Sequence, residues 1–153
     1  MVDLVLKGGD IIDGTGSSSI AGNIVINNGS IISIDNDIEL EANLELDVTG
    51  KVVCPGFIDI QSHSRPSFVG DGDGRVVSKV TMGVTTEIMG ESTTNGPSSP
   101  AMLREADSAV GTTVFETFGD WMRAMEAHGT SVNVGSFVGA TTIRVLGKGE
   151  AMG

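Results

Sequence analysis

Apolar and polar residues alternate in short runs over the first 54 residues, and glycine and asparagine separate the runs. This alternation is typical of β-strands that bury one face. The strands that it predicts span residues 3–6, 10–13, 23–27, 30–34, 45–48 and 51–54. Asn28-Gly29 is a strong hairpin signal, because both central residues of the favoured two-residue turn need a positive φ. We expect the last two strands to pair with each other. The isoleucines expected on one side of the hairpin are Ile24, Ile26, Ile32 and Ile34.

From Pro55 onward the pattern changes to strands that alternate with helices. The strands predicted here span residues 57–60, 84–89 and 131–138. The helices predicted here span residues 75–82, 101–106 and 118–128. The clearest helix follows Thr117, where Asp120 three residues on gives a weak capping box, and it ends at Gly129. Strands that alternate with helices indicate parallel β/α units.

The fold class that we predict is α/β, the N-terminal part of a TIM-like (β/α)8 barrel preceded by a small β module. Three parallel strands do not close such a barrel, which needs eight strands and about 250 residues. The predicted domains are residues 1–54, part of a composite β-sandwich, and residues 55–153, the first three β/α units of a truncated barrel. We expect the open sheet to leave apolar faces and an edge strand exposed.

Charge and composition restrict the partners of the chain. Its 153 residues include 9 basic and 20 acidic ones, which gives a net charge of −11 and a pI of about 4.3. Such a surface disfavours nucleic acid and anionic membranes. The sequence shows neither an apolar run of membrane-spanning length nor the features of a signal peptide. The single cysteine, Cys54, excludes an internal disulfide, and we expect it to be buried at a strand end. A cytoplasmic, reduced protein is the expectation.

Candidate chemistry gathers where the first strand after Pro55 ends. Residues 51–64 read Lys-Val-Val-Cys-Pro-Gly-Phe-Ile-Asp-Ile-Gln-Ser-His-Ser, so the run turns polar after Ile60. Barrels of this class present catalytic groups at the carboxyl ends of their strands. The run resembles the first barrel strand of the metal-dependent amidohydrolase superfamily, whose usual text is Pro-Gly-Phe-Ile-Asp followed by a His-x-His pair. In this chain Gln61 takes the place of the first histidine, and His63 remains.

Further stretches resemble one branch of that superfamily, the N-acyl-D-amino-acid deacylases or D-aminoacylases. These stretches are residues 3–9, 12–16, 80–86 and 133–139. The resemblance thus runs along nearly the whole chain, and the order and spacing of the pieces make it fairly specific. It implies a zinc hydrolase in which histidine with carboxylate or cysteine ligands at strand tips holds one or two divalent ions. The ion activates water against an amide, and an aspartate expected beyond residue 153 handles the proton.

The resemblance assigns metal-binding roles to three residues. His63 matches the second histidine of the pair and is the expected ligand. Gln61 occupies the first ligand position, where an amide oxygen is a poor zinc ligand, so one metal position is weakened or lost. Glu91 is a further candidate ligand, one position away from Ser92, which aligns with a cysteine ligand of the deacylases.

The same resemblance suggests residues around the metal ligands. Ser64 and Arg65, in the loop after the first barrel strand, and Ser92 are candidate substrate contacts. Asp59 is expected to orient the strand tip or a ligand. His128, in the last turn of the predicted helix at residues 118–128, is interpreted as a surface residue.

The implied activity is hydrolysis of a small-molecule linear amide, an N-acyl-D-amino acid, to a D-amino acid and a carboxylate by the full-length protein. Without the missing C-terminal barrel half, we expect the chain alone to be inactive. One alternative is a cyclic-amide hydrolase of the dihydroorotase or hydantoinase type, which shares the first-strand motif but usually keeps both histidines. Another is a non-catalytic binding scaffold with a decayed metal site, which Gln61 favours. The acyl group, the amino-acid side chain, the metal and the assembly state, including a homo-oligomer, stay open.

Overall fold

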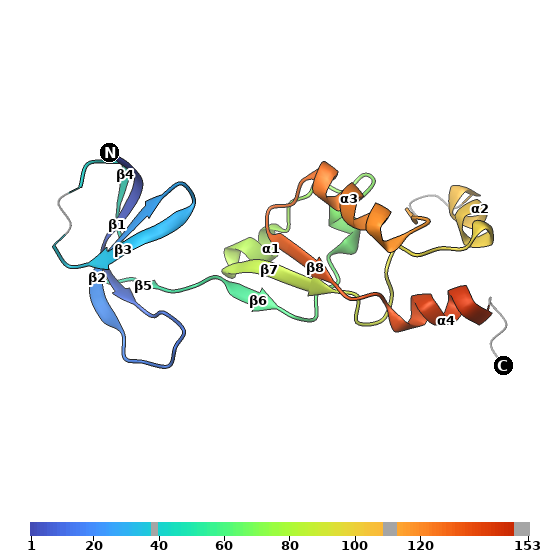
Figure 1. The fold of residues 1–153 in the computed structure, drawn as a ribbon, viewed down its shortest axis with the longest axis horizontal. Helices are drawn as coiled ribbons and strands as arrows, with labels where there is room; N and C mark the ends of the chain where they lie inside the picture. Colours follow the sequence, from blue (N-terminus) through green and yellow to red (C-terminus); the bar gives the residue numbers. More distant parts are fainter. Residues whose placement is uncertain (38–39, 109–112, 149–153) are drawn as a thin grey trace. The chain divides into compact units, whose positions relative to one another are not determined.

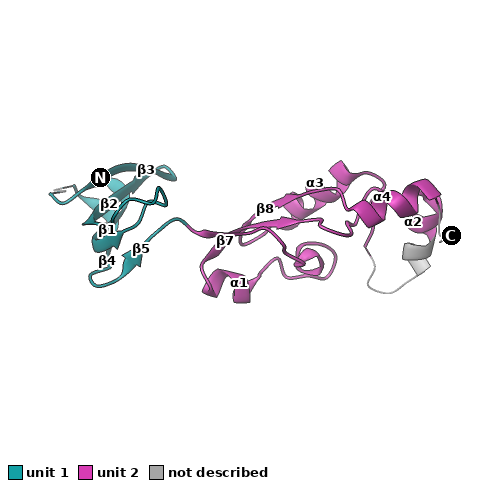
Figure 2. Ribbon diagram, turned by 90° about the horizontal axis from the view of Figure 1, so that it is seen from below, with its two compact units in different colours: residues 1–55 teal, residues 56–153 magenta. Residues whose placement is uncertain are grey.

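The structure of the chain is a computed structural model that describes residues 1–37, 40–108 and 113–148. It divides into two compact units, unit 1 (Met1–Pro55) and unit 2 (Gly56–Gly153), which Figure 2 shows in different colours. The division falls where the sequence pattern changes from strands alone to strands alternating with helices. Figure 1 shows strands β1–β5 in unit 1, and β6–β8 with helices α1–α4 in unit 2.

Unit 1 is built on one mixed sheet. Its strands are β1 (Val2–Ile11), β2 (Ile20–Asn27), β3 (Ser30–Asp35), β4 (Ala42–Asp47) and β5 (Val52–Val53). The strand order is β3-β2-β1-β4, and β5 also pairs with β1. β1 runs antiparallel to β2 and parallel to β4 and β5. Its buried cluster is small and consists of Val2, Val5 and Val25, with Ala42 packed against them.

Two predictions about the strands of unit 1 are wrong. The runs at residues 3–6 and 10–13 are not separate strands, because β1 continues through Gly8, whose φ is +74°, with a register shift between Leu6 and Gly9. The second error is the pairing of residues 45–48 with 51–54. β4 and β5 instead pair with successive parts of β1, which is long enough to accept both.

The predicted hairpin is confirmed. β2 and β3 pair antiparallel across Asn28 and Gly29, whose φ values are +50° and +72°. Ile24 is buried and lies opposite Ile34. A register shift makes Ile32 the extra residue of β3, and its side chain is 54% exposed. The expected row of isoleucines is therefore only partly formed, because the bulge breaks the two-residue alternation.

Unit 2 has the parallel β/α order that the sequence predicts. Its strands β6 (Phe57–Asp59), β7 (Val84–Met89) and β8 (Asn133–Ser136) form a parallel sheet in the order β6-β7-β8. Helix α1 (Val77–Thr81) and the short 3-10 helix η1 (Arg65–Phe68) connect β6 to β7. Helices α2 (Pro100–Ser108) and α3 (Phe118–His128) connect β7 to β8. Helix α4 (Ala140–Lys148) follows β8 and has no counterpart among the predicted elements.

Helix α3 supplies two of the largest side chains in the core of unit 2. The predicted capping box is present: the Asp120 amide donates to Thr117 Oγ1 (3.0 Å), and the Thr117 amide donates to Asp120 Oδ2 (3.3 Å). Trp121 and Met125, one turn apart, are buried. They pack with residues of η1 and of the sheet, and the cluster is Phe68, Val69, Val76, Met89, Trp121, Met125 and Val132. Figure 1 shows α3 lying along the β7–β8 side of this sheet.

The edge of the sheet of unit 2 is apolar and open, as expected for part of a barrel. Phe57 and Ile58 of β6 are 60% and 63% exposed.

Cys54 of unit 1 is exposed, so the prediction that it is buried is wrong. It follows β5 directly, in the extended chain before Pro55, and belongs to neither hydrophobic cluster. Within the described residues, no helix combines the length and the apolar character needed to span a bilayer.

Candidate functional site

The candidate ligands meet where β6 and β7 end. Gln61 and His63 follow β6, and Glu91 lies two residues after the end of β7. Gln61 Nε2 donates a hydrogen bond to Glu91 Oε2 (2.7 Å), and His63 Nε2 lies 3.9 Å from the same oxygen. β6 and β7 are parallel, so both chains leave the sheet at the same edge and their polar side chains meet there.

The donor types in this group fit part of a zinc site. Zinc binds imidazole nitrogen and carboxylate oxygen at about 2.0–2.2 Å, so two ligands of one tetrahedral ion lie about 3.3 Å apart. The separation of 3.9 Å between His63 Nε2 and Glu91 Oε2 is slightly longer than that. The described residues contain no cluster of three or more histidine, cysteine, aspartate or glutamate side chains that could hold a metal ion. His63 and Glu91 therefore fit two positions of such a site.

Asp59 holds the backbone at the start of the site loop, residues 61–64. Its Oδ1 accepts a hydrogen bond from the Gln61 amide (3.0 Å), and its Oδ2 pairs with Lys79 Nζ from α1. The hydrogen bond from Lys79, with that from the Gln61 amide, holds the pKa of Asp59 below its usual range. The same contact with Asp59 raises the pKa of Lys79. Asp59 is therefore a carboxylate at neutral pH, and it orients the chain that carries Gln61 and His63.

The sequence analysis did not predict a role for a buried glutamate below the site loop, Glu87. Glu87 of β7 is fully buried, and it accepts hydrogen bonds from Ser62 Oγ (2.5 Å) and Ser64 Oγ (3.1 Å). The signal that could have found it is an acidic residue in the middle of the strand Val-Thr-Thr-Glu-Ile-Met, which is otherwise apolar or β-branched. An acid inside a buried strand needs hydrogen-bonding partners.

The three residues expected to contact substrate lie in different surroundings. Ser64 is engaged with Glu87 beneath the loop. Arg65 is half-buried, and its Nη1 donates to Asn95 Oδ1 (3.0 Å) in the loop after β7. Burial lowers the pKa of Arg65, which nevertheless stays a cation in any ordinary buffer. Ser92 is exposed at the tip of β7, with its Oγ 3.4 Å from Thr141 Oγ1.

Arg65 lines a cavity of about 520 Å³ that opens between the loops after β6 and β7. Other polar groups in its wall are Asn95, Thr94 and Asp71. The cavity therefore combines one positive and one negative side chain with hydrogen-bonding groups, close in sequence to His63 on one loop and to Glu91 on the other. A small molecule with an amide and a carboxylate that can reach Arg65 suits this lining.

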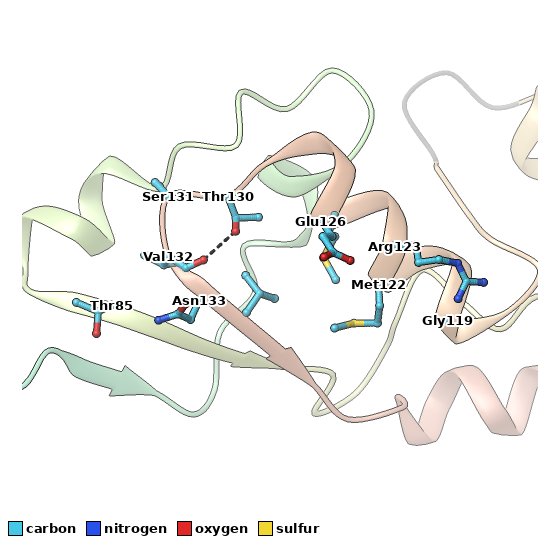
Figure 3. Close-up of a pocket in the computed structure, with 11 residues that line it drawn as sticks. Thr85, Gly119, Met122, Arg123, Glu126, Thr130, Ser131, Val132 and Asn133 are labelled. Atoms are coloured by element: carbon cyan, nitrogen blue, oxygen red, sulfur yellow. Dashed lines mark hydrogen bonds between the residues drawn. The ribbon is translucent and has the colours of Figure 1, made fainter. Parts of the chain in front are cut away.

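A second cavity, of about 700 Å³, lies at the other end of the strands (Figure 3). Figure 3 shows that its wall comes from α3, with Met122 and Glu126, and from the segment that enters β8, where Thr130 Oγ1 donates to the Val132 carbonyl (2.8 Å). Thr85, near the start of β7, also contributes. Chemistry in α/β barrels sits at the carboxyl ends of the strands, so this cavity is not part of the candidate site.

The chain is similar to known deacylases over nearly its whole length. It is 31% identical over 150 residues to a D-aminoacylase of Alcaligenes xylosoxydans xylosoxydans, a match that covers 93% of the chain and 30% of that enzyme. A crystal structure of D-aminoacylase, which defines a novel subset of amidohydrolases, matches 98% of the chain at a TM-score of 0.81 and 30% identity, over 32% of its own length. No family model matches the chain.

A related structure contains a metal. The N-acyl-D-glutamate deacylase of Bordetella bronchiseptica, solved with zinc and a phosphonate that mimics the tetrahedral intermediate, matches 95% of the chain and 31% of its own length. The TM-score is 0.81 and the identity 28%. A dihydroorotase of Thermoanaerobacter sp. is 42% identical over only 66 residues, which are 42% of the chain and 15% of that enzyme.

The parallel β/α order, the polar strand tips and these matches define the class, which is that of the amidohydrolases. Within this class the chain is D-aminoacylase-like, and it spans about 30% of the length of the D-aminoacylase relative. The fold described here is therefore part of a larger domain.

Proposed function

We propose that the protein carrying this chain hydrolyses N-acyl-D-amino acids to D-amino acids and carboxylates with one or two divalent metal ions, of which Zn²⁺ is the expected one. The observation that carries the proposal is the approach of His63 Nε2 to within 3.9 Å of Glu91 Oε2 at the shared edge of β6 and β7. Similarity to deacylases over 93% of the chain supports the same reaction.

His63 and Glu91 would hold the metal through an imidazole nitrogen and a carboxylate oxygen. A bound ion of this kind lowers the pKa of water towards neutrality and polarises the amide carbonyl. Gln61 donates to Glu91 Oε2 and so keeps the carboxylate turned towards His63. With an amide where the family has an imidazole, we expect Gln61 to weaken one of two metal positions.

Arg65 is the residue that we propose binds the free carboxylate of the substrate. A guanidinium pairs with a carboxylate through two parallel hydrogen bonds, which fixes both position and orientation. The side chain of Arg65 is already held in place by Asn95 at the wall of the 520 Å³ cavity. Ser92, exposed after the end of β7, is the proposed contact for the amide or acyl part of the substrate. Ser64 supports the site loop through its hydrogen bond to Glu87.

The described residues provide two metal donors, and the chain spans about 30% of the relative's length. We therefore propose that the chain alone is inactive and that the reaction needs the remaining part of the larger domain. That part would supply the other ligands and the aspartate that handles the proton.

The test uses the full-length protein that carries this chain. Metal content and hydrolysis are measured on N-acyl-D-amino acids, their L enantiomers and dihydropyrimidines. We expect bound zinc and turnover of the D substrates, and loss of both in His63→Ala. His128→Ala, which changes the exposed histidine at the end of α3, is the matched control and keeps both.

Two results would favour the other functions. Turnover of dihydropyrimidines rather than linear amides would point to the cyclic-amide hydrolase, for which the similarity covers only 66 residues. A folded, metal-free protein would point to a binding scaffold. One observation favours the binding scaffold. The side-chain amide of Gln61 already donates a hydrogen bond to Glu91 Oε2, so this carboxylate has a partner without a metal ion.

A further inference from the structure

We propose that Glu87 is a positioning residue for His63, which it orients by binding the hydroxyl groups of the two serines on either side, Ser62 and Ser64. The inference rests on the proposed function in one respect, namely that His63 binds the metal. It adds a residue that acts from below the site and that touches neither metal nor substrate.

The contacts form a clamp, defined as Glu87 with Ser62 and Ser64. Each carboxylate oxygen takes one hydroxyl: Oε2 accepts from Ser62 Oγ at 2.5 Å, and Oε1 accepts from Ser64 Oγ at 3.1 Å. The two hydroxyl oxygens are themselves 3.1 Å apart. Glu87 is 0% and Ser62 3% exposed, so water does not compete for the hydrogen bond between them, whereas Ser64 is partly buried.

The clamp explains why the ring of His63 points outward. Ser62 and Ser64 turn inward to the same carboxylate, and the side chain of the residue between them is 69% exposed. The Ser62 amide also donates to the Ile88 carbonyl of β7 (3.1 Å). The backbone on both sides of His63 is therefore held by groups of β7.

β7 and the residues directly after it provide both Glu87, which holds the loop of His63, and Glu91, the second candidate ligand. Glu87 lies within the strand and fixes the loop that bears His63, whereas Glu91, four residues further on, offers the second donor. Glu87 ties the loop that bears His63 to the same strand from which the chain continues to Glu91, so the two loops share one point of attachment. Sites built on strands are held more closely than sites built on two independent loops.

The burial of Glu87 argues against a role in packing alone. Removing a carboxylate from water is costly unless it is well paired, and an apolar residue of similar size would fill the same space at lower cost. The other fully buried side chain of β7, Met89, is apolar.

The test measures two properties of the full-length protein: its affinity for Zn²⁺, by competition with a chelator, and amide hydrogen exchange at residues 62–64. In the double variant Ser62→Ala/Ser64→Ala we expect the Zn²⁺ affinity to fall about 10-fold or more, as for other supporting residues of metal ligands. Exchange at residues 62–64 should become faster. The melting temperature should also fall, because the buried carboxylate of Glu87 loses both serine hydroxyls, so the Zn²⁺ affinity is measured well below it. Glu87→Gln, which keeps the shape and one acceptor oxygen, should give a smaller loss.

Two exposed residues provide matched controls. Glu126→Gln removes an acidic group from the surface of α3, and Ser78→Ala removes a hydroxyl from α1. Neither should change affinity or exchange. If either the double serine variant or Glu87→Gln proves unstable, the other still tests the clamp, because each variant weakens the same hydrogen bonds from a different side.

The failure of this inference differs from the failure of the proposed function. If His63→Ala loses Zn²⁺ but the folded serine and Glu87→Gln variants keep wild-type affinity and exchange, the clamp is wrong and the metal site stands. If His63→Ala keeps full Zn²⁺ affinity, the metal role of His63 is wrong, and with it the positioning proposal.

Discussion

Unit 1 and unit 2 are both built around β-sheets, yet only unit 2 gathers polar residues into a candidate site. The sheet of unit 1 buries three valines and two isoleucines, Ile11 and Ile24, whereas unit 2 buries larger side chains such as Trp121, Phe68 and Met89. In unit 1 the central strand β1 is antiparallel to β2, so neighbouring strand ends point to opposite edges. In unit 2 all three strands are parallel, and the ends of β6 and β7 bring Gln61, His63 and Glu91 together. Parallel strands thus do two things at once: they admit helices that build a larger core, and they align the strand tips.

The largest expected effect is on the core of unit 2. Trp121→Ala should lower the free energy of unfolding of unit 2 by about 3–5 kcal/mol, because the side chain is fully buried and its removal leaves a cavity. Hydrogen exchange read separately for the two units is the measurement. Met82→Ala, at a residue that is 62% exposed, is the control. Equal loss of protection in β1 and β7 would contradict the independence of the units.

A smaller effect is expected from the core of unit 1. Val25→Ala removes two methyl groups from a fully buried side chain and should lower the stability of unit 1 by about 2 kcal/mol. Urea unfolding with exchange at β1 and β2 measures it. Ile31→Ala on β3, at a residue that is 61% exposed, should cost much less. If both variants lose the same amount, the three valines are not the core of unit 1.

The ion pair beneath the site should make unit 2 sensitive to acid. Asp59→Asn should lower stability at pH 7 by about 1.5 kcal/mol, because it replaces a hydrogen-bonded charge that is less than one-third exposed. Since contact with Lys79 and then with the Gln61 amide lowers the pKa of Asp59, its contribution is present above about pH 4 and is lost as the pH falls through the folded value.

Urea unfolding at pH 7 and at pH 3 checks this expectation. The difference between the wild-type protein and Asp59→Asn should shrink at the lower pH. Asp73→Asn is the control, because the Asp73–Arg75 pair is largely exposed and such pairs add little to stability. A difference that stays constant with pH would show that the carboxylate form of Asp59 does not stabilise the loop.

The smallest effect concerns the start of α3. Thr117→Ala removes the side-chain acceptor of the capping box and should cost about 1 kcal/mol of the stability of unit 2. Thr117→Ser, which keeps an oxygen at the same place, should stay near the wild type. Thermal unfolding of both variants is the measurement. Equal melting temperatures for the alanine and serine variants would mean that the cap does not limit the stability of α3.

Local signals in the sequence were enough for the elements that depend on local chemistry. The strand at 84–89 and the helix at 118–128 have the predicted bounds, because β-branched residues and a capping box with apolar spacing define them. The hairpin at Asn28-Gly29 follows from two positive φ angles. The parallel order of unit 2 followed from the alternation of the elements.

Features that depend on distant partners were not accessible from local patterns. β1 looked interrupted, because Gly8 and Gly9 break its alternation, and only pairing with β2, β4 and β5 shows one strand. Helix α4 was missed. At the site, the meeting of Gln61, His63 and Glu91 followed from the expectation of parallel strands, and their role as ligands stays a prediction. A signal for Glu87 was present in the sequence, but none for its partners Ser62 and Ser64 in the loop after β6.

The central place of β1 in unit 1 has a consequence for synthesis on the ribosome. β1 emerges before the strands that pair with it, and β2 can cover one side of it as soon as the β2–β3 hairpin closes. The other edge of β1 stays unpaired until β4 and then β5 have been synthesised. Ala42 of β4 pairs with Val2, 40 positions earlier in the chain. Contacts so far apart along the chain form slowly, and an unpaired edge invites association with other chains. Of the strands in this sheet, the one synthesised earliest is therefore among the last to have both of its edges covered.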